Sequence, residues 1–134
     1  VRVVVSTLQD LRKLQHHVEN RRKAQGVKTI DYVDHPRQSG YRAVHLICMY
    51  GRDPRPVEVQ LRTSTMHAWA EMVEQVSNIV GVNRKQDGDT AFHRWARLYS
   101  SILEAQELGK PSPVTDDEFN EAWSAMLEEG RSHD

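Results

Sequence analysis

The stretch Pro56-Val-Glu-Val-Gln-Leu-Arg62 alternates apolar and polar side chains. Alternation predicts a strand, because successive side chains of a strand point to opposite faces of the sheet. The apolar members are expected to face a hydrophobic core: Val57, Val59 and Leu61. The polar members are expected to share the other face, about 7 Å apart: Glu58, Gln60 and Arg62. Taken alone, such a row is most simply a solvated sheet face, although a carboxylate there is able to bind Mg²⁺ or to take a proton from a hydroxyl.

Further strands are predicted around this stretch from β-branched and apolar runs, at residues 1–5, 27–33 and 43–50. The turn-forming residues 51–55 then join 43–50 to 56–62 as a hairpin. Between the first two strands, Thr7 and Asp10 have the spacing of a helix N-cap, and apolar residues recur at helical intervals to about residue 24.

The second half of the chain is predicted to be helical. Apolar stripes at three- and four-residue spacing run through 66–80 and 92–103, with a polar loop at 83–89 between them. A capping box at Thr115 and Glu118 opens a last helix, whose apolar members are Phe119, Trp123 and Leu127. The predicted class is α+β, a small mixed or antiparallel sheet covered by helices and followed by a helical C-terminal tail.

Composition limits the function classes. The 134 residues carry a formal net charge of −1, so binding of nucleic acid by bulk electrostatics is not expected. No apolar run approaches the ~20 residues that span a bilayer. The single cysteine, Cys48, excludes an internal disulfide and is consistent with a reducing cytoplasm.

A second candidate stretch is Pro36-Arg-Gln-Ser-Gly-Tyr-Arg-Ala-Val-His45. The ring of Tyr41 is suited to stacking on a base, Arg37 and Arg42 supply positive charge for phosphate, and His45 is able to donate to a nucleotide oxygen. The alternative is a surface turn that leads into a strand. A common site requires His45 and Glu58 to face one side of the hairpin, so that paired residue numbers add up to an odd number, as Met49 opposite Glu58 would.

Three blocks, in this order and spacing, resemble the synthetase domain of the RelA/SpoT family: residues 31–45 (DYVDHPRQSGYRAVH), 57–63 (VEVQLRT) and 66–71 (MHAWAE). The resemblance is to small, single-domain members, and implies a nucleotidyltransferase-like fold. It also implies transfer of pyrophosphate from ATP to the 3′-hydroxyl of GTP or GDP, giving (p)ppGpp, with Mg²⁺ as cofactor.

The resemblance also implies roles for individual residues. Tyr41 would stack on the guanine of the acceptor, and Glu58 would bind Mg²⁺ and activate the 3′-hydroxyl. The other acceptor-site positions are Arg37, Ser39, His45, Gln60, Arg62 and His67. Two of them depart from the family pattern, since Arg37 stands where lysine is usual and Ser39 where asparagine is common. Arg2 is matched to an arginine near the donor adenine.

The first residues resemble the end of the family's Asp-x-x-Gly-x-Arg motif, whose aspartate would precede Val1. We therefore expect an N-terminally incomplete catalytic core, the acceptor half, in residues 1–82, and a helical extension of the same domain in residues 83–134. The hydrolase domain's histidine–aspartate motif is absent from the sequence.

Two alternatives remain open at this point. One is a catalytically silent member of the family that binds nucleotide or acts as a regulatory module. The other transfers pyrophosphate to the 3′ end of tRNA. A cytoplasmic location is expected, and the apolar helices of the tail would suit a homo-oligomer.

Overall fold

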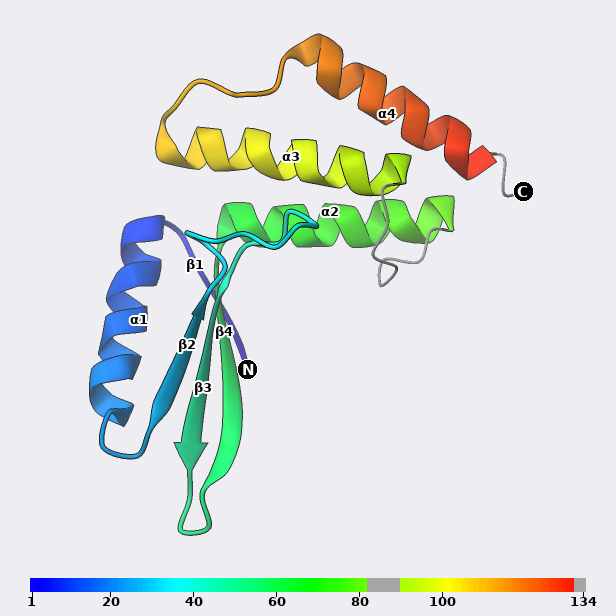
Figure 1. Ribbon diagram of the computed structural model, residues 1–134. Coiled ribbons are helices and arrows are strands. Elements are labelled where there is room, and N and C mark those ends of the chain that lie inside the picture. Colours follow the sequence, from blue (N-terminus) through cyan, green and yellow to red (C-terminus); the bar gives the residue numbers. More distant parts are fainter. Residues whose placement is uncertain (82–89, 132–134) are drawn as a thin grey trace. The chain divides into compact units, whose positions relative to one another are not determined.

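The computed structural model describes residues 1–81 and 90–131. Its elements are β1 (Arg2–Val5), α1 (Leu8–Arg22), β2 (Val27–Asp31), β3 (Val44–Tyr50), β4 (Arg55–Thr63), α2 (Ser64–Val80), α3 (Ala91–Leu108) and α4 (Asp116–Arg131) (Figure 1). The strands form one sheet in the order β1-β4-β3-β2, with β1 parallel to β4 and the other neighbours antiparallel. The predicted α+β class with a mixed sheet and a helical C-terminal part is confirmed.

The first helix begins where its cap predicts. The hydroxyl of Thr7 accepts a hydrogen bond from the backbone N–H of Asp10 at 3.1 Å, which satisfies one of the free donors of the first turn. The helix ends at Arg22, two residues before the predicted end. β2 also ends early, at Asp31, because the Asp31 carboxylate accepts the backbone N–H groups of Val33 and Asp34 and so starts a turn.

One face of the sheet packs against α1 and forms the core of this part of the chain. The fully buried members include Leu11 of α1 and, from β3 and β4, Val44, Leu46, Cys48 and Leu61. Val59 packs against the same cluster, as its place in the alternating stretch predicts. The polar side chains of residues 56–62 therefore point to the other face of the sheet.

The chain divides into two compact units, one of Val1–Arg37 and Tyr41–His67, the other of Gln38–Gly40 and the chain from Ala68 onward. The first unit holds the sheet and α1. The predicted boundary between catalytic core and extension, at residues 82/83, and the predicted loop at 83–89 lie outside the described residues.

The helices of the second unit follow their predicted stripes with one correction. In α4 the buried side chains are Ala122 and Met126, whereas Trp123 is 37% exposed. Phe119 and Leu127 are only half-buried. The capping box itself is confirmed, because the Thr115 hydroxyl accepts the backbone N–H of Glu118 at 3.1 Å. The helix therefore starts as predicted, but its buried stripe is centred on smaller and more flexible side chains than the aromatic ones.

Candidate functional site

The register of the β3–β4 hairpin decides which polar side chains share a face. His45 lies opposite Gln60, and Ile47 lies opposite Glu58, so every pair adds up to an odd number. His45 and Glu58 therefore face the same side of the sheet, as a common site requires. The example pair of Met49 and Glu58 is wrong by two residues, because Tyr50 pairs with Arg55 and leaves a four-residue loop.

The side chain of Glu58 is exposed, and its surroundings favour the charged form of its carboxylate. Nε2 of Gln60 donates to Oε1 of Glu58 at 2.7 Å. This hydrogen bond, together with the positive charge of Arg37, lowers the pKa of Glu58. The geometry thus provides an exposed, ionised carboxylate on the same face of the sheet as His45.

Tyr41, His45 and Arg62 form a hydrogen-bonded chain on the same face. Nη2 of Arg62 donates to the Tyr41 hydroxyl at 3.2 Å, and that hydroxyl lies 2.8 Å from Nε2 of His45. Because arginine only donates, the Tyr41 oxygen accepts from Arg62, and the tautomer of His45 decides which of Tyr41 and His45 donates in their hydrogen bond. The Tyr41 ring is therefore held through its hydroxyl. The rings of Tyr41 and His45 meet edge-on, with an angle of 73° between their planes.

Burial and positive neighbours favour the neutral form of His45. Its side chain is buried, which lowers its pKa, and the guanidinium groups of Arg37 and Arg62 act in the same direction. The charge of Glu58 acts in the opposite direction. A neutral His45 with no proton on Nε2 is able to accept the hydrogen bond of the Tyr41 hydroxyl.

Tyr32 belongs to this cluster, and sequence reasoning did not single it out. Its ring meets the ring of His45 edge-on, with centroids 5.2 Å apart, and the ring of Tyr41 at 6.0 Å. Nη2 of Arg37 donates to the Tyr32 hydroxyl at 2.9 Å, and the guanidinium carbon lies 4.6 Å from the centre of the Tyr32 ring. The available signal was a second tyrosine inside the same sequence block as Tyr41.

The remaining predicted site residues are placed as follows. Arg2 is exposed and pairs in register with Gln60 across the parallel β1–β4 ladder, so both lie on the face of His45. His67 lies in the first turn of α2, four residues after the end of β4. Ser39 belongs to the second unit, with Gln38 and Gly40. Arg42, which had been considered for phosphate, is buried, with 4% of its surface exposed.

The Glu58 carboxylate also has the chemistry to contribute to a divalent metal site. Among the described residues no group of three or more His, Cys, Asp or Glu side chains gathers to form a complete metal cage. Mg²⁺ commonly takes only one or two carboxylates from the protein and the rest of its ligands from phosphates and water. One ionised and exposed carboxylate fits that mode of binding, and does not fit a structural metal site.

The described helices include none that is long and apolar enough to cross a membrane. Against known proteins, the family model described as "Region found in RelA / SpoT proteins" matches residues 1–78, more than half of the sequence. The chain belongs to the RelA/SpoT family. The candidate cluster and Glu58 all lie within the matched residues.

Similar RelA/SpoT proteins come from several bacteria. The chain is 36% identical over 72 residues to a GTP pyrophosphokinase of Haemophilus influenzae, covering 54% of this chain and 10% of that protein. It is 30% identical over 106 residues to a guanosine-3′,5′-bis(diphosphate) 3′-pyrophosphohydrolase of Vibrio cholerae, covering 79% of this chain and 15% of that protein. The chain thus spans only a small part of these relatives.

Solved structures share the fold. Small alarmone synthetase 1 of Bacillus subtilis, bound to its product pppGpp, aligns with a TM-score of 0.62 at 21% identity, covering 81% of this chain and 57% of that one. A GTP pyrophosphokinase family protein of Streptococcus pneumoniae aligns with a TM-score of 0.59 at 22% identity, covering 95% of this chain and 63% of that one. At this identity the likeness concerns the fold.

Proposed function

We propose that this RelA/SpoT chain carries the acceptor site of a GTP pyrophosphokinase, which transfers pyrophosphate from ATP to the 3′-hydroxyl of GTP or GDP. The observation that carries the proposal is the shared face of the hairpin, where ionised Glu58 lies beside the Tyr41–His45–Arg62 chain. The relative from Haemophilus influenzae is named for this activity, and the Bacillus subtilis structure holds a product of it. Residues 1–82 would form the catalytic core and residues 83–134 its helical extension.

Tyr41 would bind the guanine and fix the orientation of the acceptor. Its hydroxyl is held by Arg62 and His45, so its ring would offer a base a surface that is already oriented. Arg37 and Arg62 would supply positive charge to the phosphates, with Ser39, His45, Gln60 and His67 as further acceptor contacts. Arg37, which donates to the Tyr32 hydroxyl, would be one of the side chains that contact these phosphates.

Glu58 would accept the proton of the 3′-hydroxyl, for which its ionised form is required. The 3′-oxygen then forms a bond to the β-phosphorus of ATP while the bond from that phosphorus to the bridging oxygen of the α-phosphate breaks, and AMP leaves with the electron pair. Mg²⁺, when bound, neutralises charge on the donor phosphates, and Glu58 is the residue of this chain that would hold it. On the donor side, exposed Arg2 would contact ATP. A cytoplasmic location is part of the proposal.

The test is pyrophosphate transfer by the full-length protein, donor half included, supplied with ATP, Mg²⁺ and GDP or GTP, and followed as AMP release and formation of the 3′-pyrophosphorylated nucleotide. Glu58→Gln is expected to lower the rate by about 10² or more, because an amide takes up no proton. The matched control is Glu121→Gln on α4, whose carboxylate lies 4.0 Å from Arg94 on an exposed surface.

Three outcomes would contradict the proposal. Unchanged transfer by Glu58→Gln would reject the role of that carboxylate. Nucleotide binding without AMP release would favour the catalytically silent alternative. Labelled phosphate that appears on tRNA, and not on GDP or GTP, would favour transfer to the tRNA 3′ end.

A further inference from the structure

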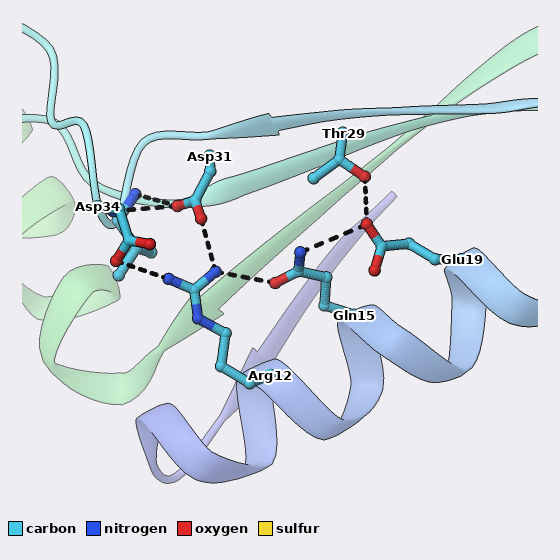
Figure 2. A network of polar contacts seen from close by, with 7 residues as sticks. Arg12, Gln15, Glu19, Thr29, Asp31 and Asp34 are labelled. Carbon is cyan, nitrogen blue, oxygen red and sulfur yellow. Dashed lines mark hydrogen bonds and ion pairs between the residues drawn. The ribbon is translucent and has the colours of Figure 1, made fainter.

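A network of polar contacts joins α1 to β2 and to the turn that follows it (Figure 2). At its centre is Arg12 of α1, whose guanidinium contacts two carboxylates at once. Nη1 donates to Oδ2 of Asp31 at 2.8 Å, and Nη2 donates to Oδ1 of Asp34 at 2.9 Å. Nη1 also donates to Oε1 of Gln15 at 2.9 Å. The planar fork of arginine is suited to such a bridge, which a lysine ammonium cannot reproduce.

The second oxygen of Asp31 organises the backbone of the turn. Its Oδ1 accepts the backbone N–H of Val33 at 2.9 Å and that of Asp34 at 3.0 Å. The N–H of Tyr32 donates to the carbonyl oxygen of Ala43 at 2.9 Å. The backbone is therefore fixed on both sides of Tyr32. Without Arg12, the carboxylates of Asp31 and Asp34 would repel each other within this turn.

The turn positions Tyr32, whose side chain packs against the proposed acceptor site. The ring of Tyr32 lies edge-on to the rings of His45 and Tyr41, and its hydroxyl accepts from Arg37. A continuous set of contacts thus runs from the helix on one face of the sheet, through the turn, to the aromatic cluster on the other face.

We propose that Arg12 is a positioning residue of the acceptor site: through Asp31 and Asp34 it fixes the turn that seats Tyr32 against Tyr41 and His45. The inference rests on the proposed function, because the affected property is binding of a guanine nucleotide. The proposal gives Arg12 no contact with the nucleotide, since its guanidinium is held by Asp31, Asp34 and Gln15. No other residue reaches from α1 to Asp34 in the network drawn in Figure 2.

The same network supplies a matched control. About two helical turns after Arg12 on α1, Glu19 accepts a hydrogen bond from the hydroxyl of Thr29 at 2.5 Å and one from Gln15 at 3.4 Å. These contacts fasten the same helix to the same strand, but they do not reach the turn. Thr29→Val is therefore expected to weaken the packing of α1 on β2 without moving the Tyr32 side chain.

The experiment compares Arg12→Met, Arg12→Lys and Thr29→Val by GDP titration calorimetry and by the midpoint of urea unfolding. We expect Arg12→Met to raise the Kd for GDP by about tenfold, Arg12→Lys to lie between it and the wild type, and Thr29→Val to leave the Kd unchanged. Equal changes of Kd in Arg12→Met and Thr29→Val, or no change in either, would show that Arg12 only fastens the helix. If Arg12→Met does not fold, Arg12→Lys decides by the same comparison.

A second measurement needs no nucleotide. NMR titration of the His45 ring should give a pKa below the ordinary 6.5 in the wild type and in Thr29→Val, and a higher one in Arg12→Met, because a displaced Tyr32 opens His45 to water. An unchanged His45 pKa in Arg12→Met would overturn the positioning role. If the wild type fails to bind GDP, the proposed function is wrong, while this titration still decides whether Arg12 seats Tyr32.

Discussion

At the scale of single residues, the account depends on the hydrogen-bonded chain from Arg62 through Tyr41 to His45. Arg62 has only 7% of its surface exposed, and it is paired with a neutral hydroxyl and not with a carboxylate. A buried guanidinium of this kind keeps a positive charge close to the place proposed for the acceptor phosphates. His45 must then stay neutral, since a second buried cation beside Arg62 and Arg37 would be unfavourable.

This neutral histidine gives the folding stability a defined pH dependence. The pKa of His45 is lower in the folded protein than its ordinary value of 6.5, chiefly because of burial, so the unfolded chain takes up the proton first. Its contribution to stability is complete above pH 6.5, falls as the pH drops from 6.5 to the folded-state pKa, and does not change further below it. The lowered pKa of Glu58 acts in the same direction, but around and below its ordinary value of 4.5.

The check is urea unfolding of the wild type and of His45→Gln at about pH 7.5 and about pH 5.5. The wild type should lose more stability between these two values than the variant does, because both proteins share every other titrating group. Equal losses in the two proteins would contradict the account of a histidine kept neutral by its surroundings.

Several of these residues were predictable and others were not. Alternation along residues 56–62 was enough to place Glu58, Gln60 and Arg62 on one face, and the odd-number rule correctly placed His45 with them. The contribution of Tyr32 was not predictable from pattern, because it depends on the turn closed by Asp31 and on a guanidinium from α1. Contacts between side chains distant in sequence leave no periodic signal.

At the scale of elements, the segment before Tyr41 depends on Gly40. Its φ of 95° lies in the left-handed region, and an added Cβ would come within 2.9 Å of Cβ of Ser100 and 3.2 Å of Cζ2 of Trp69. The Ser100 hydroxyl donates to the Gly40 carbonyl at 2.5 Å. Both the backbone conformation and the surrounding space therefore require glycine.

Gly40→Ala is expected to destabilise the protein by about 3 kcal/mol, since it combines left-handed strain with a steric clash. Gly51→Ala is the matched control. Its φ of 92° is similar, but its nearest neighbour would be 3.6 Å away, so about 1 kcal/mol of backbone strain is expected. Thermal or urea unfolding measures both, and equal losses would show that the crowding at Gly40 is unimportant.

Local signals placed the ends of elements well where a cap defines them. Thr7 and Thr115 cap their helices as predicted. The buried stripe of α4 was less predictable, because the larger side chains were expected inside while Ala122 and Met126 are the ones buried. Trp123 instead lies at the rim with its ring 5.4 Å from that of Trp95. Hydropathy ranks residues, but the space available to a helix decides which of them fit.

At the scale of the whole molecule, the order of three sequence blocks carried more information than any block alone. The matched residues 1–78 contain the four strands, α1, most of α2 and the whole Tyr41 cluster. The division of the chain into an acceptor part and a helical extension at residues 82/83 is a functional proposal. The two structural units divide elsewhere, between His67 and Ala68 within α2. Association into homo-oligomers stays a prediction, which sedimentation of the protein at several concentrations would decide.

Tyr41 is proposed to hold the guanine of the acceptor, and GDP titration calorimetry measures this contact. Base–aromatic stacking contributes about 1–3 kcal/mol, so Tyr41→Ala should weaken GDP binding by roughly five- to 150-fold. The control is Tyr50→Ala, at the exposed end of β3 under Arg22, which should bind GDP as the wild type does. A wild type that does not bind GDP, or a Tyr41→Ala variant that binds it equally well, would contradict the account.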